Sequence, residues 1–258
     1  MDILLRGAQK LGYHLTQYQL ACFQKYQVLL EDWNTVISLT SIDSPNDVQL
    51  KHFLDSIAAS VSMGKETLEY GTLLDVGSGA GFPGIPLKIM WPGLKVTLIE
   101  STRKKADFLR LVSHSLGLSG LTICNDRSEL AAHDPNMRES FDIVVARAIA
   151  NLSTLAELTI PFCKVGGKVI AYKNAGITDE INESIEALTI LGGTYQETLS
   201  VDLEGLEGQR CLVILSKDCP TDHMYPRRPG IPYKRPLTGR SKQPRESTRN
   251  TYDPTNLE

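Results

Sequence analysis

The chain has 258 residues, of which 41% are apolar and 22% charged, and this composition is ordinary for a folded globular protein. It contains no apolar run close to the ~20 residues that a membrane-spanning helix needs, and its first residues lack the apolar stretch and cleavage site of a secretory signal. We therefore expect a soluble, cytoplasmic, monomeric protein with one main domain and no membrane partner.

The net charge of −3 hides an uneven distribution of charge along the chain. Residues 1–224 hold 19 basic and 27 acidic side chains, whereas residues 225–258 hold 8 basic and 3 acidic ones. A basic tail on an acidic body is consistent either with a solubilising tail or with an arm that binds phosphates. The five scattered cysteines include no Cys-x-x-Cys pair, so we expect neither a disulfide framework nor a metal site.

Two amphipathic helices are predicted before the first strand, over residues 14–33 and 48–61, because aromatic and aliphatic side chains recur there at helical spacing. From residue 72, short β-rich runs alternate with helical stretches, which is typical of βαβ units around a mainly parallel sheet. The runs 194–203 and 209–217 leave no room for a crossover helix between them and predict a terminal antiparallel hairpin.

Seven strands closed by such a hairpin favour an α/β fold of the class I S-adenosylmethionine-dependent methyltransferase type, with a Rossmann-like seven-stranded sheet and an N-terminal helical extension. We divide the chain into this extension (residues 1–66), the methyltransferase domain (residues 67–219) and a basic, proline-rich tail (residues 220–258). The tail beyond about Thr238 has almost no aliphatic periodicity and is expected to be disordered.

The most informative segment is LLDVGSGAGFPG, over residues 73–84, which leads from a strand through a glycine-rich turn into a helix. Glycines such as Gly77 and Gly79 let a nucleotide-like ligand approach main-chain N–H groups at the start of a helix. From Gly79 onward the segment also satisfies the G-x-G-x-x-G spacing of NAD and NADP enzymes.

Charge favours S-adenosylmethionine over a dinucleotide in this loop. Asp75 ends the strand beneath the loop, where a carboxylate would repel a pyrophosphate but would suit a sulfonium and an ammonium. Glu100 closes the second strand 25 positions later and can accept hydrogen bonds from the ribose hydroxyls of either cofactor. Two rivals stay open: an NADP-linked oxidoreductase with Arg103 near a 2′-phosphate, and a non-catalytic RNA-binding protein on the same scaffold.

Polar residues also follow the third and fourth strands. Ser128 and Glu129 lie in a stretch where an adenine would bind, although Asp126 or Ser128 could instead cap a helix. Arg147 stands at the inner rim of the expected cleft, either as a salt-bridge partner or as a ligand contact.

The segment Ala146–Ile149 has neither the Asn/Asp-Pro-Pro-aromatic loop of exocyclic amino methyltransferases nor the cysteine nucleophile of carbon-5 pyrimidine enzymes. An acceptor that is already nucleophilic suits what remains. The N7 atom of guanine has a free lone pair and no proton to lose, so its methylation needs in-line positioning and little acid–base assistance.

Several segments together resemble the glucose-inhibited division protein B (GidB, RsmG) family, which methylates guanine N7 in 16S ribosomal RNA. The matching segments are DWNTVISLTSI, HFLDS, LLDVGSGAGFPGIPLKI, VTLIESTRKKADFL, FDIVVARAIANLSTLAEL, GGKVIAYKNA and YPRRPGIPYKRPL, spread over residues 32–237. The chain departs from the family where Ser38-Leu39-Thr40 replaces an Asn-Leu-Thr, which leaves open how the N-terminal helices meet RNA.

The resemblance implies an S-adenosylmethionine-dependent 16S rRNA (guanine-N7)-methyltransferase whose partner is 16S ribosomal RNA or the small ribosomal subunit. It implies cofactor contacts at Gly77 and Phe82, at the Ser128–Glu129 pair, and at Arg147 beside the methyl-transfer site. Arg147 and Lys173 are the residues that we expect to orient the base. Because the base must leave its stack to react, structured single-stranded RNA is favoured over duplex.

Two groups of basic residues are expected to contact RNA phosphates. The first opens the helix after Glu100, and the second lies in the tail. They are Arg103, Lys104 and Lys105 in the first group, and Arg227, Arg228, Lys234 and Arg235 in the second.

Overall fold

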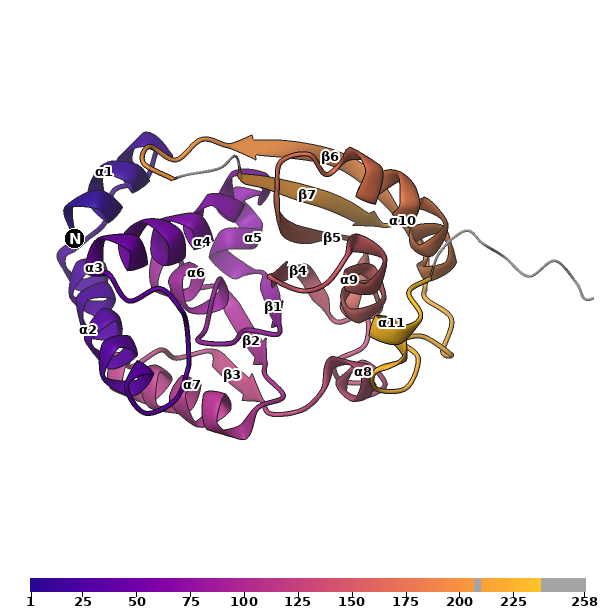
Figure 1. Ribbon diagram of the computed structural model, residues 1–258, viewed down its shortest axis with the longest axis horizontal. Helices are drawn as coiled ribbons and strands as arrows, with labels where there is room; N and C mark the ends of the chain where they lie inside the picture. Colours follow the sequence, from indigo (N-terminus) through magenta and orange to yellow (C-terminus); the bar gives the residue numbers. More distant parts are fainter. Residues whose placement is uncertain (207–209, 238–258) are drawn as a thin grey trace, which may run out of the picture.

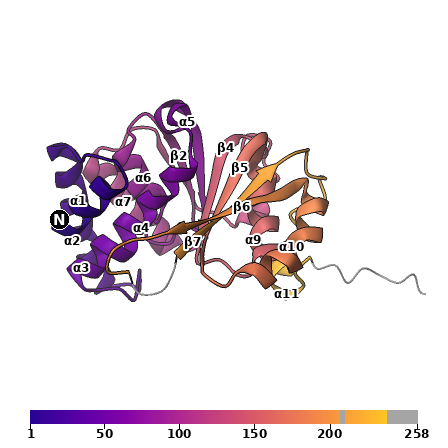
Figure 2. The same cartoon turned by 90° about the horizontal axis from the view of Figure 1, so that it is seen from above.

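Seven strands form one twisted sheet in the middle of the molecule, with helices on both of its faces (Figure 1, Figure 2). This computed structural model describes residues 1–206 and 210–237. The strand order is β3-β2-β1-β4-β5-β7-β6. The strands are β1 (Thr72–Val76), β2 (Lys95–Ile99), β3 (Leu121–Cys124), β4 (Phe141–Arg147), β5 (Cys163–Asn174), β6 (Gly193–Val201) and β7 (Arg210–Lys217).

Strands β1 to β5 are parallel to one another, and β7 runs antiparallel between β5 and β6. The predicted α/β methyltransferase-type sheet with a terminal antiparallel pair is therefore confirmed. Because β1 lies between β2 and β4, the chain winds outward in both directions from this point. In an open parallel sheet, ligands bind in the crevice at the carboxyl ends of the strands on either side of such a switch.

The central strands are apolar on both sides because helices cover both faces of the sheet. Leu73 and Leu74 of β1 are completely buried, as are Val144 and Val145 of β4. Neighbouring side chains along each strand point to opposite faces, so these residues contribute to separate apolar clusters on the two sides. Such uninterrupted apolar runs position the polar strand ends, and with them the site.

Figure 2 shows the two helical layers, with α1, α2, α6 and α7 on one side of the sheet and α9, α10 and α11 on the other. On the first side the helices are α1 (Asp2–Lys10), α2 (Gln17–Asn34), α3 (Pro45–Asp47), η1 (Val48–Leu54), α4 (Asp55–Ile57), η2 (Ala58–Ser62), α5 (Lys65–Tyr70), α6 (Gly84–Met90) and α7 (Arg103–Leu116). The others are α8 (Ser128–Ala131), α9 (Leu152–Thr159), η3 (Ile160–Phe162), α10 (Thr178–Leu191) and α11 (Ile231–Lys234).

The N-terminal region matches the expected helices only in part. The first is present as α2, which begins at a capping box formed by Thr16 and Gln19. The second is divided into η1, α4 and η2, which follow the short helix α3, and η1 is a seven-residue π-helix. Helix α1 was not predicted. A π-helical turn is rare and is found frequently at functional sites, so η1 is relevant to the site described below.

The N-terminal helices share one hydrophobic core with the sheet. Phe23 and Tyr26 of α2 belong to the same buried cluster as Leu73 of β1 and Ile214 of β7. The expected boundary at residue 66 therefore does not coincide with a gap in the packing, and the division into domains stays a prediction. The tail packs on the opposite side as far as residue 237, and the disorder expected beyond Thr238 lies outside the described residues.

Candidate active site

A cleft of about 490 Å³ opens at the carboxyl ends of the central strands. This volume is typical of a pocket for a small molecule or cofactor. Six of the seven residues predicted for the cofactor side line the cleft. They are Gly77, Gly79, Glu100, Ser128, Glu129 and Arg147.

The glycine loop forms the floor of this cofactor cleft. Gly77 and Gly79 have φ values of +69° and +58°, in the left-handed region that favours glycine. The N–H groups of Gly77 and Ser78 donate to the carbonyl of Ile99, at 2.9 and 3.0 Å, and tie the loop to β2. A Cβ atom on Gly77 would lie 3.2 Å from Ile149, so glycine keeps the floor of the cleft open.

Glu100 closes one end of the glycine loop. Its carboxylate accepts hydrogen bonds from the N–H groups of Gly79, at 3.0 Å, and Thr102, at 2.6 Å, and the residue is only 6% exposed. A carboxylate has about four acceptor positions, so these two bonds leave room for ribose hydroxyls. The side chain is thus fixed by the backbone in the position that the sequence predicted for it.

Asp75 lies beneath the loop but is not part of the cleft wall. One carboxylate oxygen accepts a hydrogen bond of 2.9 Å from the N–H of Gly84 at the start of α6. The other has no hydrogen-bond partner within residues 1–206 and 210–237. Complete burial raises the pKa of this carboxyl to about 7. The acidic residues that line the cleft are instead Glu100, Asp126 and Glu129.

Phe82 lies under the site and is only 5% exposed. Its ring stacks on His52, with 4.3 Å between the ring centroids, and the guanidinium of Arg147 lies 5.2 Å from its centroid. This geometry makes Phe82 a support for Arg147, and its predicted contact with the cofactor stays a prediction.

Arg147 is both a salt-bridge partner and a wall of the cleft. Its guanidinium donates to the carboxylate of Asp55 at 3.0 Å, to the carbonyl of Lys51 at 3.0 Å and to Nδ1 of His52 at 3.1 Å. Burial, with the positive charge of Arg147, lowers the pKa of His52 to about 3. The neutral ring therefore accepts from Arg147 at Nδ1 and donates from Nε2 to the hydroxyl of Thr40, 2.8 Å away.

Reasoning from the sequence missed the partners of Arg147. His52 and Asp55 are buried polar residues, 6% and 1% exposed, in a helical stretch that also holds buried apolar side chains such as Phe53 and Leu54. Polar groups are buried when they have partners, so these two positions carried a signal for a functional contact. In the sequence, HFLDS belongs to the segments that resemble the GidB family, and neither His52 nor Asp55 has a predicted role.

The C-terminal segment closes one end of the cofactor cleft. The sequence did not predict this contact. The N–H of Gly230 donates to the carboxylate of Glu129 at 2.9 Å, and Tyr233 of α11 lines the cleft. Glu129 is therefore held between α8 and α11, and only 4% of its surface is exposed.

Lys173 does not line the cofactor cleft. Its ammonium donates to the carbonyl of Ala150 at 2.7 Å and to the carboxylate of Glu180 at 2.6 Å. Ala148, in the same loop as Ala150, has a φ of +58°, a conformation that costs a non-glycine residue about 1–3 kcal/mol. The position of Lys173 suits it to hold this strained loop, and a direct role in orienting the base stays a prediction.

The basic residues expected to bind RNA occupy different environments. Arg227 donates three hydrogen bonds to the carboxylate of Glu157, which has no exposed side-chain surface. This buried ion pair occupies the guanidinium. Five other predicted contacts have side chains on the surface, and Lys105 lines the cofactor cleft. The surface residues are Arg103, Lys104, Arg228, Lys234 and Arg235.

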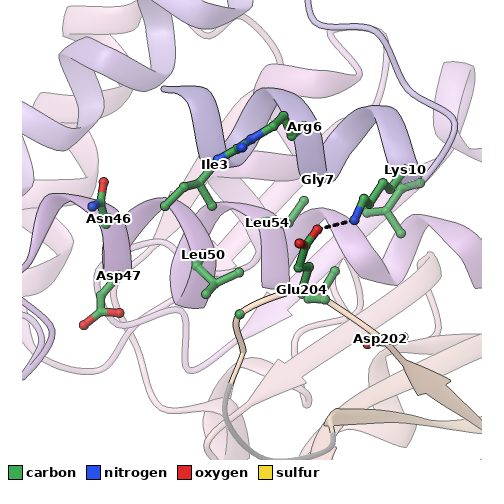
Figure 3. Close-up of a pocket in the computed structure, with 13 residues that line it drawn as sticks. Ile3, Arg6, Gly7, Lys10, Asn46, Asp47, Leu50, Leu54, Asp202 and Glu204 are labelled. Carbon is green, nitrogen blue, oxygen red and sulfur yellow. Dashed lines mark hydrogen bonds and ion pairs between the residues drawn. The ribbon is translucent and has the colours of Figure 1, made fainter.

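Two further hollows lie near the N-terminal helices. One of them adjoins the cofactor cleft, has a volume of about 370 Å³ and shares Arg147, Ala148 and Ile149 with the cleft. We call it the second cavity. A separate groove, also of about 370 Å³, lies between α1, η1 and the segment after β6, where Lys10 pairs with Glu204 (Figure 3). None of the predicted site residues lines that groove.

The sheet order and the glycine-loop cleft define a class I S-adenosylmethionine-dependent methyltransferase fold. A solved structure titled "Crystal Structure of MtNAS in complex with MTA and tNA" shares it, with a TM-score of 0.51 and 16% identity over 79% of this chain and 71% of that one. Within the described residues, no helix combines the length and the apolar character required to cross a bilayer.

The family described as "rRNA small subunit methyltransferase G" (GidB) matches residues 19–210. A protein of that name from Dehalococcoides mccartyi (strain CBDB1) is 46% identical over 239 residues, which cover 92% of this chain and 100% of the relative. One from Roseiflexus sp. (strain RS-1) is 43% identical over 237 residues, with 92% and 100% covered. The chain therefore belongs to the rRNA small subunit methyltransferase G family.

Proposed function

We propose that this protein transfers a methyl group from S-adenosylmethionine to N7 of a guanine in the 16S RNA of the small ribosomal subunit. One observation carries the proposal. The glycine-loop cleft is complete in a chain whose relatives, 46% identical along their whole length, are named for methylation of small-subunit rRNA. Since ribosomal RNA is the substrate, the proposed place of action is the cytoplasm.

The residues of the cofactor cleft suit S-adenosylmethionine, which carries a sulfonium and an ammonium. The cleft is lined by charges of both signs: the carboxylates of Glu100, Asp126 and Glu129 suit the cationic groups of the cofactor, and the cationic side chains of Lys105, Arg127 and Arg147 suit its carboxylate. The absence of a side chain at Gly77 leaves the space that a ligand over the loop requires. When bound, the cofactor supplies a methyl group whose bond to sulfur breaks as the bond to the acceptor forms, with the electron pair left on sulfur.

The chain's own contribution to the reaction is positioning. N7 of guanine attacks with its lone pair and has no proton to lose, so no general base is required. Arg147 is held by Asp55 and His52 at the point where the cofactor cleft meets the second cavity. The uncharged imidazole of His52 orients the guanidinium without adding a second positive charge beside it.

The exposed basic residues support an RNA partner. Arg228, Lys234 and Arg235 lie in the segment that closes the cleft, and Arg103 and Lys104 begin α7 after β2. Phosphate contacts of this kind position a nucleic acid without reading its sequence. We include these residues in the proposed RNA-binding surface and leave out Arg227, whose guanidinium is occupied by Glu157.

The test is transfer of a labelled methyl group from S-adenosylmethionine to small-subunit RNA and to small-subunit particles, followed by digestion to nucleosides. We expect label in 7-methylguanosine. Label in another nucleoside would refute the N7 assignment, and no label in either substrate, with cofactor binding intact, would refute the ribosomal assignment. Lys105→Ala should weaken cofactor binding more than Lys104→Ala does, because only Lys105 lines the cleft.

A further inference from the structure

The second cavity lies beside the cofactor cleft, with Arg147, Ala148 and Ile149 as a shared wall. A group bound in one hollow would therefore lie next to a group bound in the other, at the junction that these three residues line. The other lining residues of the second cavity come from two parts of the chain. Ser41 and Lys51 belong to the N-terminal region, and the remainder lie at the ends of β5 and β7. Its volume of about 370 Å³ is within the range of pockets that bind small molecules.

The second cavity is lined by cationic side chains alone among the charged residues, whereas the cofactor cleft is lined by charges of both signs. Its charged wall residues are all cationic, and of the described residues none with a carboxylate lines it. They are Lys51, Arg147, Lys173 and Arg210. Their carboxylate partners, Asp47, Asp55 and Glu180, do not line this cavity, whereas three carboxylates and three cations line the cofactor cleft. The second cavity therefore favours an anionic ligand.

Only two of these four cations are accessible enough to meet a ligand at the rim. The side chains of Arg147 and Lys173 are 14% and 11% exposed and are held by Asp55 and Glu180. Those of Lys51 and Arg210 are 32% and 31% exposed. Lys51 pairs at 3.0 Å with Asp47, whose side chain is 42% exposed, and such a surface pair is weak enough to exchange for a phosphate.

We propose that the second cavity receives the acceptor guanosine, unstacked from its RNA, and that Lys51 and Arg210 bind the phosphates on either side of it. This inference rests on the proposed function. The flipped base lies against the shared wall, where N7 meets the methyl group, and the rim cations hold the backbone that delivers it. The N-terminal region then supplies half of the acceptor site.

The first test compares Lys51→Ala and Arg210→Ala with Lys95→Ala, an exposed lysine at the amino end of β2, and Arg110→Ala on the surface of α7. We expect the first two to raise the KM for RNA about fivefold and to lower the slope of log K against log salt by about 0.7 each, the value for one single-strand phosphate contact. Affinity for S-adenosylmethionine should not change, and the two controls should match the parent protein.

The second test fills the cavity. Ser41 is exposed and lines the second cavity but not the cofactor cleft, so Ser41→Trp should block RNA methylation while cofactor affinity is kept. The control is Ser119→Trp, at an exposed site before β3, which should stay active. Full activity of Ser41→Trp, or RNA affinity unchanged in both rim variants, would overturn the inference and leave the proposed function standing. An inactive parent protein would instead refute the proposed function.

Discussion

Arg147, at the end of β4, donates a hydrogen bond of 3.0 Å to the carboxylate of Asp55, which lies in the helical region before the sheet and is only 1% exposed. Ninety-two positions of sequence separate the two residues. The contact makes the N-terminal helices part of the site, because they determine where the guanidinium lies. It also places a charge pair where loss of one partner leaves the other buried.

Asp55→Asn should destabilise the protein by about 3 kcal/mol, because the guanidinium of Arg147 would stay buried without its counter-charge. The control is Asp47→Asn, which removes a carboxylate from the exposed pair with Lys51 on the same helical stretch and should cost less than about 1 kcal/mol. Urea unfolding of both variants measures the difference. Equal losses would show that Asp55 and Arg147 form no buried pair.

His52→Gln should remove an acid-dependent loss of stability. Burial lowers the pKa of His52 from its ordinary value of 6.5, which holds in the unfolded chain, to about 3 in the folded protein. Between these two pH values the folded state therefore binds fewer protons than the unfolded state. The contribution of His52 to stability is therefore complete above pH 6.5 and falls toward pH 3, by up to about 1.4 kcal/mol per pH unit. Glutamine keeps an acceptor for Arg147 and a donor for Thr40 but has no proton to gain.

The measurement is the free energy of unfolding of parent and variant from pH 4 to 7.5, compared as a difference. Burial raises the pKa of Asp75 to about 7, so its contribution is lost as pH rises through that value and has the opposite sign. Asp75 is present in both proteins and cancels. Parallel curves for the parent and His52→Gln would contradict the neutral, buried imidazole.

Glu100→Gln should weaken binding of S-adenosylmethionine by about tenfold to a hundredfold, as expected for loss of hydrogen bonds to a charged group. The carboxylate is anchored by Gly79 and Thr102, so the change acts at one fixed point of the cleft. Titration calorimetry measures it, with Glu183→Gln on the exposed side of α10 as control. An affinity equal to that of the control would remove Glu100 from the cofactor site.

Arg227→Ala and Arg228→Ala should differ although the residues are neighbours. Loss of the Arg227 guanidinium leaves the buried carboxylate of Glu157 without its counter-charge and should cost about 3 kcal/mol of stability. Arg228 is exposed, so its removal should change stability by less than about 0.5 kcal/mol and should weaken RNA binding instead. Thermal unfolding and RNA titration at several salt concentrations separate the two effects. The reverse pattern would assign Arg227 to RNA.

Local patterns were sufficient for the sheet and for the cofactor loop. The run TLLDV is β1 residue for residue, and the glycine loop and Glu100 lie together because both follow carboxyl ends of adjacent strands. The partners of charged side chains were not predictable in this way. Arg147 contacts Asp55, 92 positions away in the sequence, and Arg227 contacts Glu157, 70 positions away. Tertiary packing brings these residues together, and no local spacing in the sequence encodes it. The π-helical turn η1 also lacks a simple sequence period.

The most direct test of the proposed guanine-N7 methylation is to map the methylated position in the RNA itself. Borohydride reduces the imidazolium ring of 7-methylguanosine, and aniline then cleaves the RNA strand at the reduced nucleotide. Small-subunit RNA treated with this protein and S-adenosylmethionine can therefore be scanned for new cleavage sites. We expect cleavage at one guanosine, absent when the cofactor is omitted and strongly reduced in Arg147→Lys. RNA that gains methyl groups but no such cleavage site would contradict the proposed guanine-N7 methylation.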